Sequence, residues 1–352
     1  MRKRQLTDLC DERLVDRGNR ILDDLFRKGS HSIRQLTASD SDAKGFYRFL
    51  QNDRVTEADI IKNLSANCRQ AASGKHVVCI QDSTEINLSA HSGRIKKDGC
   101  IGTTNANNKM GLGFFLHPCL VLDATECIPY GYAAVKVWNR PLEFASKHTR
   151  QYNKLPIEDK ESYKWIEVSE QSKNALADTV SSMVIVQDRE GDIYEQFALL
   201  PDHKTDLLVR ARVNRTLPDK TKLFDCLGDQ PCQGTYQVSV EGKKGRQGRV
   251  ATIEVRFREV TISRTDASSR SVPRTISLSL IEARERDYEG EDGICWRLLT
   301  TIEVTDIDLA RMCIEWYSWR WTIEEVFKIL KKEGFDMEAS ELEYASSVRK
   351  MC

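Results

Sequence analysis

The sequence predicts a mixed α/β protein with a helical region at its start and a β-rich segment in its second half. Residues 1 to about 73 carry apolar side chains at helical spacing. From Lys75 onward, apolar strands that end in polar residues alternate with a helix, which is typical of an α/β sheet with its site at one edge. Residues 205–289 combine strand-forming residues with turn signals.

The first 73 residues predict three helices. The segment RLVDRGNRILDDLFRKG ends at Gly29, and DAKGFYRFLQND forms a second, shorter helix. A third helix starts with a capping box formed by Thr56 and Asp59 and runs to Ala72. The apolar residues expected on one side of the first helix are Leu14, Ile21, Leu22, Leu25 and Phe26.

These helices also carry the basic residues Arg13, Arg17, Arg20 and Arg48. A small basic helical module commonly binds DNA, but a solvated helical bundle can have the same composition. Both interpretations remain open from this region alone.

The next region predicts the central sheet. HVVCIQD is a buried strand that ends in Asp82, and GLGFFLHPCLVLDA and IPYGYAAVKVW follow as strands of an antiparallel meander. Residues 139–165 are polar and irregular. A helix over about 166–180 then leads into SSMVIVQD, a second buried strand, which ends in Asp188.

The β-rich segment carries a local excess of positive charge. Residues 206–274 contain 14 Lys or Arg against eight Asp or Glu, although the whole chain has 53 of each. Such a segment could lie along a phosphate backbone, while a sheet with solvated charged residues predicts the same excess. ICWRLLTTIEV is a further strand, and residues 305–332 predict two helical segments.

Composition limits the class of protein. The 352 residues suit two or three domains. No stretch approaches 18 apolar residues and the start lacks an apolar signal region, so we expect a cytoplasmic protein. The 11 cysteines form no CxxC pair and the six histidines form no HExxH pattern, which argues against structural zinc.

The most informative stretch is WYSWRWTIEEVFKILKK. Tyr317, Arg320 and Lys331 fall within roughly 40° of Glu324 on a helical wheel, and Lys328 joins the same stripe. A solvated helix face with Glu and Lys at i,i+4 spacing is the alternative. A carboxylate among cations at the edge of an apolar face is suited to metal and phosphate chemistry.

Three acidic residues complete the candidate site. Asp82, Asp188 and Glu324 are far apart in sequence, and each sits where a strand end or helix face could reach a common centre. Neighbouring carboxylates repel one another unless cations neutralise them. Two Mg²⁺ or Mn²⁺ ions would do so and would support in-line attack on a phosphodiester.

These motifs resemble those of a known family. Asp82 in IQDST, Asp188 in QDREGDIYE and the spacing Tyr317-x2-Arg320-x3-Glu324-x6-Lys331 are similar to the Asp-Asp-Glu triad and the Tyr-Arg-Glu-Lys signature of insertion-sequence transposases of the IS-four family, Tn-five type. The similarity extends through GFYRFL and ESYKW and covers nearly all of the chain. It implies a ribonuclease-H-like mixed sheet flanked by helices, with a β-rich insertion and an N-terminal helical domain.

The resemblance also implies domains and residue roles. The expected domains are a helical DNA-binding domain (1–73), the catalytic core in two parts (74–204 and 290–352) and a β-rich insertion (205–289). The implied metal ligands are Asp82, Asp188 and Glu324. The implied DNA contacts are Tyr317, Arg320, Lys328, Lys331, Arg210, Trp296 (stacked on a flipped base), Arg13, Arg17 and Arg48. Trp316, Trp319 and Trp321 are assigned mainly to core packing.

The function expected from the resemblance is cut-and-paste DNA transposition in the bacterial cytoplasm. Metal-dependent hydrolysis and strand transfer would act on double-stranded DNA, at transposon ends and target, through a hairpin and within a homodimer. The family's C-terminal dimerisation region is expected to be missing from this chain, which could make it a fragment or an inactive remnant. Two alternatives stay open: a truncated, non-catalytic protein that binds DNA ends, and a ribonuclease-H-like nuclease unrelated to transposition.

Overall fold

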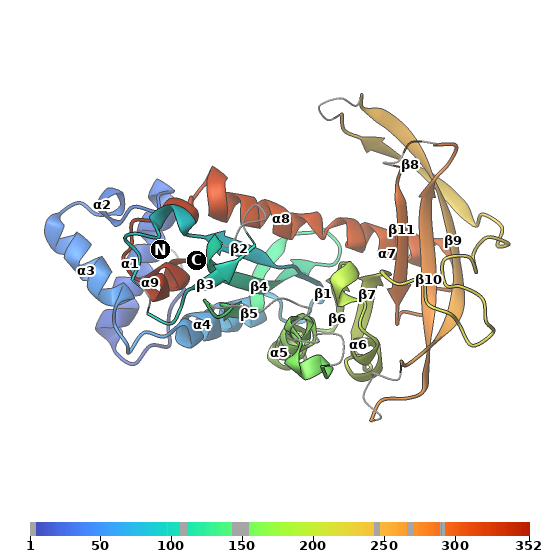
Figure 1. Ribbon diagram of the computed structural model, residues 1–352, viewed down its shortest axis with the longest axis horizontal. Helices are drawn as coiled ribbons and strands as arrows, with labels where there is room; N and C mark the ends of the chain where they lie inside the picture. The colour runs from blue at the N-terminus through green and yellow to red at the C-terminus, as the bar shows by residue number, and fades with distance from the viewer. Residues whose placement is uncertain are drawn as a thin grey trace.

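The computed structural model describes residues 5–96, 98–105, 111–142, 155–242, 247–265, 271–288, 290 and 293–352. Within these ranges the chain forms a mixed α/β structure around one large sheet (Figure 1). The polar segment expected at 139–165 and the turn in EGKKGRQGR lie partly outside the described residues. No helix of the described ranges is long and apolar enough to cross a membrane.

Four helices open the chain: α1 (Glu12–Lys28), α2 (Ile33–Leu36), α3 (Asp40–Leu50) and α4 (Glu57–Ala71). Gly29 ends α1 in the left-handed region at φ 56°, where a residue without a Cβ is favoured. Thr56 and Asp59 form the predicted capping box of α4. The predicted helices are therefore confirmed, but Phe26 is 64% exposed and was wrongly expected on the buried side.

Two glycines let α1 and α3 cross closely. A Cβ at Gly18 would lie 2.5 Å from a methyl of Leu6 and 2.9 Å from the Phe49 ring. A Cβ at Gly45 would lie 2.4 Å from Nη1 of Arg17, so the Arg17 side chain rests against α3 only because position 45 has none. This packing sets where the basic residues of the first helices point.

In the part of the chain that the structure describes, the sheet has eleven strands. Its main path runs β2-β4-β1-β6-β7-β11-β10-β9-β8, and β3 and β5 both pair with β4. The strands are β1 (His76–Gln81), β2 (Thr84–Asn87), β3 (Gly102–Thr104), β4 (Gly111–Asp123), β5 (Pro129–Trp138), β6 (Ser182–Gln187), β7 (Thr205–Arg210), β8 (Gly234–Val240), β9 (Arg249–Ser263), β10 (Thr275–Glu285) and β11 (Cys295–Thr300).

The strands β1, β6 and β7 are parallel neighbours, whereas β4 is antiparallel to β1 and to β5. The predicted antiparallel meander and both buried strands before the aspartates are confirmed. The β-rich segment does not form a separate sheet, because β7 pairs with β11 and so joins β8–β11 to the central strands.

Helices cover both faces of the central strands. The remaining helices are α5 (Lys164–Leu176), α6 (Tyr194–Leu199), α7 (Ile307–Ser318), α8 (Trp321–Lys328) and α9 (Ala345–Met351). Short 3-10 turns occur at Ser89–His91, Ile157–Asp159, Glu161–Tyr163, Arg189–Gly191 and Met337–Ala339, and a π-helical segment, η7, spans Ile329–Glu333.

Strand alternation separates two cores. Cys79 and Ile185 face α5 and α6, whereas Ile80 and Val186 face α7 and α8. A third core joins the first three helices to β2, β4 and α9, near both chain ends (Figure 1). The helix α4 packs against β5 of the sheet.

Candidate functional site

The two aspartates follow neighbouring parallel strands. Ile80 of β1 pairs with Val186 of β6, so Asp82 and Asp188 come two residues later at the same edge of the sheet. The same register brings Arg210, at the end of β7, level with Asp188. Alternation turns these three side chains toward the face covered by α7 and α8.

A proline interrupts the ladder beside Asp82. The pairings of Gln81 with Cys119 and of Thr84 with Leu116 show that β1 and β2 continue one another in a single register along β4. Pro118 lies on β4 within this gap and has no backbone N–H to donate. The strand therefore breaks at Asp82 and Ser83, the point from which the Asp82 carboxylate projects.

The predicted helical stripe spans a break between α7 and α8. Trp319 and Arg320 form a turn in which Arg320 N donates to Tyr317 O at 3.1 Å, and Thr322 N donates to Trp319 O at 2.9 Å. These i,i+3 bonds make this turn narrower than an α-helical turn, but α8 continues in the direction of α7. Tyr317, Arg320 and Glu324 therefore still face the sheet.

These side chains meet the aspartates directly. The Tyr317 hydroxyl donates to Asp188 Oδ1 at 2.9 Å. Arg320 Nη1 donates to Asp82 Oδ2 at 3.0 Å, and its Nη2 pairs with Glu324 Oε1 at 2.7 Å. The three acidic residues are thus connected to the α7–α8 segment through one hydroxyl and one guanidinium.

Burial dominates the electrostatics of this cluster. It raises the pKa of Asp82 to about 6, with smaller contributions from Glu324 and Asp188, against the lowering effects of the Ser83 N–H and Arg320. Burial, followed by the nearby Asp188, raises the pKa of Tyr317 to about 12, so its hydroxyl remains a donor at neutral pH.

The carboxylates do not form a ready metal cage. Among the described residues, no group of three His, Cys, Asp or Glu side chains is placed to hold a metal ion. The donor chemistry nevertheless suits Mg²⁺ or Mn²⁺, which prefer carboxylate oxygens. Arg320, 6% exposed, lies between Asp82 and Glu324 and contacts both.

The other predicted DNA contacts of the second half lie around this cluster at different depths. Lys331 sits in η7, with Nζ 3.5 Å from Thr84 Oγ1 and 3.6 Å from Glu338. Lys328 is half exposed and pairs with Glu325 and Glu333, away from the aspartates.

Trp296 and Arg210 belong to the strands beside the cluster. The Trp296 ring meets the Tyr317 ring edge to face at 5.2 Å, and Arg210 Nη2 donates to Cys295 O at 3.3 Å. Trp316 is buried, as expected, and Trp319 is partly buried against the same core. Trp321 is 54% exposed, so its assignment to core packing was wrong.

The basic residues of the first helices lie on α1 and α3, which form one end of the molecule, whereas β1 and β6 lie nearer its middle (Figure 1). Arg13 and Arg48 are exposed and Arg17 is half-buried against α3. Arg20 is also exposed and pairs with Asp42 at 2.9 Å. Among the described residues, the side-chain partners of Asp82 and Asp188 are Arg320 and Tyr317 and not these arginines.

A buried polar network under the aspartates was not predicted. Gln81 and Gln187 directly precede Asp82 and Asp188, and their amides lie 3.0 Å apart. Gln187 also bonds to Gln196. The remaining members are Ser169, whose hydroxyl lies 3.0 Å from both Gln81 and Gln187, and His117, which contacts Gln81 and Ser83. The repeated Gln-Asp at two strand ends was the available sequence signal.

Asp192, in the QDREGDIYE segment, anchors the loop after β7. It accepts from the backbone N–H of Arg212 at 2.8 Å and pairs with the Arg215 side chain, and its own side chain is fully buried. Its place in the motif is therefore explained by loop anchoring.

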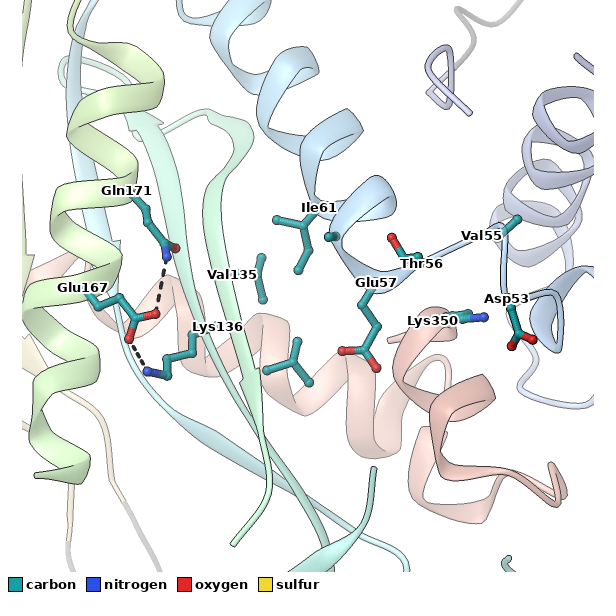
Figure 2. A pocket seen from close by; sticks show the side chains of 12 residues that line it. Asp53, Val55, Thr56, Glu57, Ile61, Val135, Lys136, Glu167, Gln171 and Lys350 are labelled. Carbon is teal, nitrogen blue, oxygen red and sulfur yellow. Dashed lines mark hydrogen bonds and ion pairs between the residues drawn. The ribbon is translucent and has the colours of Figure 1, made fainter. Parts of the chain in front are cut away.

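A cavity of about 580 Å³ opens elsewhere, between the start of α4, β5, α5 and α9 (Figure 2). Lys136 pairs with Glu167 on one side of it, and Glu57 and Lys350 line the other side. Its lining includes none of the three predicted metal ligands. This cavity is therefore separate from the cluster at the sheet edge.

Comparison with known proteins adds an assignment for the start of the chain. Residues 2–55 match the transposase DNA-binding family. This segment contains α1–α3 together with Arg13, Arg17 and Arg48. The match supports a transposase with DNA as a partner.

Among solved structures, the chain is similar to piggyBac transposase in a synaptic complex with hairpin DNA, determined by cryo-EM. The identity is 12% and the TM-score is 0.44, and the alignment covers 99% of this chain and 66% of the other. The chain therefore spans less than two thirds of the length of that transposase.

Proposed function

We propose that this chain carries the catalytic region of a cut-and-paste DNA transposase of the IS-four family, Tn-five type. The observation that carries the proposal is the meeting of Asp82, Asp188 and Glu324 around Arg320 and Tyr317, beside a transposase DNA-binding segment. Double-stranded DNA at the ends of a mobile element is the proposed substrate, and a homodimer on paired ends is the proposed assembly.

The strand order supports a ribonuclease-H-like core. The strands run in the order β5-β4-β1-β6-β7, with β4 antiparallel to its neighbours and β1, β6 and β7 parallel, and the proposed fold predicts this order. The proposed catalytic aspartates follow β1 and β6, the third and fourth strands of this order, which are adjacent and parallel. The strands β8–β10 lie between Asp188 and Glu324 in sequence, where the family has its insertion.

The proposed chemistry is endonuclease cleavage followed by strand transfer. Asp82, Asp188 and Glu324 would hold two Mg²⁺ or Mn²⁺ ions, which supply the activation of water or a 3′-hydroxyl and stabilise the leaving oxygen. The role of the protein is to bring these carboxylates together. Tyr317 remains protonated and orients Asp188, and Arg320, Lys331 and Arg210 place positive charge beside the scissile phosphate.

We also propose that the end is processed through a hairpin. Trp296 lies beside Tyr317, so an extruded base could stack against it at the edge of the cluster. The bacterial cytoplasm is the proposed location, because transposition requires access to DNA.

The decisive experiment is Asp188→Ala on an end-containing duplex with Mn²⁺. We expect salt-sensitive DNA binding to be retained while strand nicking disappears. Asp123→Ala is the matched control. Asp123 lies at the end of β4 and pairs with Val77 at the start of β1, away from Asp82, so this variant should keep nicking. Nicking that persists in Asp188→Ala would reject the catalytic role of this residue.

A non-catalytic DNA-end-binding protein is the second candidate. It is favoured by the placement of Arg320 among the carboxylates and by the match of residues 2–55 to a DNA-binding family. End-specific binding by the wild-type chain without any nicking, in Mg²⁺ and in Mn²⁺, would support it. The third alternative, a ribonuclease-H-like nuclease unrelated to transposition, predicts cleavage without preference for element ends.

A further inference from the structure

We propose that Arg320 is a resident counter-cation that occupies the carboxylate cluster in the metal-free protein and must leave it when divalent ions bind. This inference rests on the proposed function, since it concerns the same three acidic residues. It assigns to Arg320 a positioning role that precedes any contact with a DNA phosphate.

The first support is geometric. The guanidinium bridges two acidic residues that are far apart in the chain, Asp82 at 3.0 Å and Glu324 at 2.7 Å. Both carboxylates use an oxygen on this contact. A Mg²⁺ ion shared by them would sit roughly 2.0–2.1 Å from an oxygen of each, in the space between the carboxylates that the guanidinium now fills. The two cations therefore compete for one place.

The second support is charge. Asp82, Asp188 and Glu324 carry three negative charges when ionised, and Arg320 is the cation that directly contacts two of them. Tyr317 reaches Asp188 only with a neutral hydroxyl. Carboxylates held this close need a counter-charge, so the metal-free protein holds one with its own side chain.

The third support is a hydrogen-bond donor of Arg320 that lacks an acceptor among the described residues. The Nε of Arg320 is buried, and among the described residues none accepts a hydrogen bond from it. A buried donor without a partner carries a free-energy cost. The guanidinium also lies 5.1 Å from the ring of Trp321, which is 54% exposed. That aromatic face offers a second resting position at the surface, where a guanidinium can stack and meet phosphate.

The test is Mn²⁺ binding to the DNA-free protein, measured by electron paramagnetic resonance. Arg320→Gln should bind Mn²⁺ at least about tenfold more tightly than wild type, within the usual range of coupling between two ligands. Arg320→Lys keeps the charge but cannot bridge two carboxylates, so its Mn²⁺ affinity should lie between those of wild type and Arg320→Gln. The double variant with Arg320→Gln and Asp188→Asn should lose this gain in Mn²⁺ affinity.

The matched control is Arg297→Gln. Arg297 also makes a half-buried ion pair, with Glu282 at 2.8 Å, but it lies in the ladder of β10 and β11. The Mn²⁺ affinity of the Arg297→Gln variant should equal that of wild type. If Arg320→Gln is unfolded in EDTA, Mn²⁺ should restore its folding by mass action, as followed by circular dichroism, and Arg320→Lys then supplies the affinity comparison.

The outcomes separate the two proposals. Equal Mn²⁺ affinity in wild type, Arg320→Gln and Arg320→Lys would overturn the competition and leave the metal centre standing. Weaker binding in Arg320→Gln would show that Arg320 assists the metal and would also overturn the inference. No Mn²⁺ binding in any variant would remove the metal centre of the proposed function itself.

Discussion

Tyr317 and Asp188 are 129 residues apart, and the hydroxyl of one donates to the carboxylate of the other at 2.9 Å. The bond ties the end of α7 to the residue that follows β6, and apolar residues of the two elements also pack in one core. With the bond from Arg320 to Asp82, it links the helical signature directly to the sheet.

Tyr317→Phe should therefore weaken this link. Loss of a buried hydrogen bond to a charged acceptor costs about 1.5–3 kcal/mol in the free energy of unfolding, to be measured by urea denaturation. Tyr130→Phe, which removes a hydroxyl bonded to Asp123 near the surface, should cost less. An equal effect in both variants would contradict the special role of Tyr317.

Asp82→Asn should stabilise the metal-free protein at neutral pH. The pKa of Asp82 is raised to about 6 in the folded state, from 3.8. Between these values the folded state holds a proton that the unfolded state has released, so the free energy of unfolding falls as pH rises. Asparagine remains neutral, so the variant should gain on the order of 2–3 kcal/mol at pH 7 and almost nothing at pH 4.

Thermal melts in EDTA from pH 2 to 8 measure this difference. Asp123→Asn is a control in which the change in stability should have the opposite sign. Hydrogen bonds, chiefly from Tyr130, lower the pKa of Asp123 to about 2. That variant should lose stability at neutral pH and approach wild type as the pH falls toward 2. A pH-independent difference for Asp82→Asn would exclude the raised pKa.

Gln187→Leu should disrupt the buried network beneath the aspartates. It leaves Ser169 and Gln196 without a partner that they now use, at a cost of about 1–3 kcal/mol per unsatisfied group. Gln171→Leu, on the exposed side of α5, should change stability by less than about 0.5 kcal/mol. Chemical denaturation of both variants gives the comparison, and comparable stabilities would show that the network contributes little.

Gly45→Ala should affect DNA binding more than folding. The new Cβ would meet the end of the Arg17 side chain, which is flexible and can move away at little cost. If Arg17 contacts a phosphate of the end DNA, binding should weaken and the slope of log K against log salt should fall by about 1. Gly93→Ala, which meets nothing within 4 Å, is the control. If the slope of log K against log salt is unchanged in Gly45→Ala, Arg17 does not contact a phosphate of the DNA.

Much of the fold was predictable because local signals were strong. The capping box of α4, the glycine end of α1 and the two Gln-Asp strand ends each depend on neighbouring residues, and all lie where they were predicted. Phe26 and Trp321 were placed wrongly because a large apolar residue at helical spacing is buried only if another element covers it. That covering depends on packing between distant segments.

The candidate site shows the same division. Residue types and spacing in the sequence alone were enough to select Asp82, Asp188, Glu324 and the Tyr317–Lys331 segment, because acidic strand ends and helical periodicity are local properties. Only the tertiary structure decided that β1 and β6 lie side by side in register, and that Arg320 contacts Asp82 and Glu324 instead of facing solvent. These relationships depend on strand pairing and burial between segments more than a hundred residues apart, which no local pattern can specify.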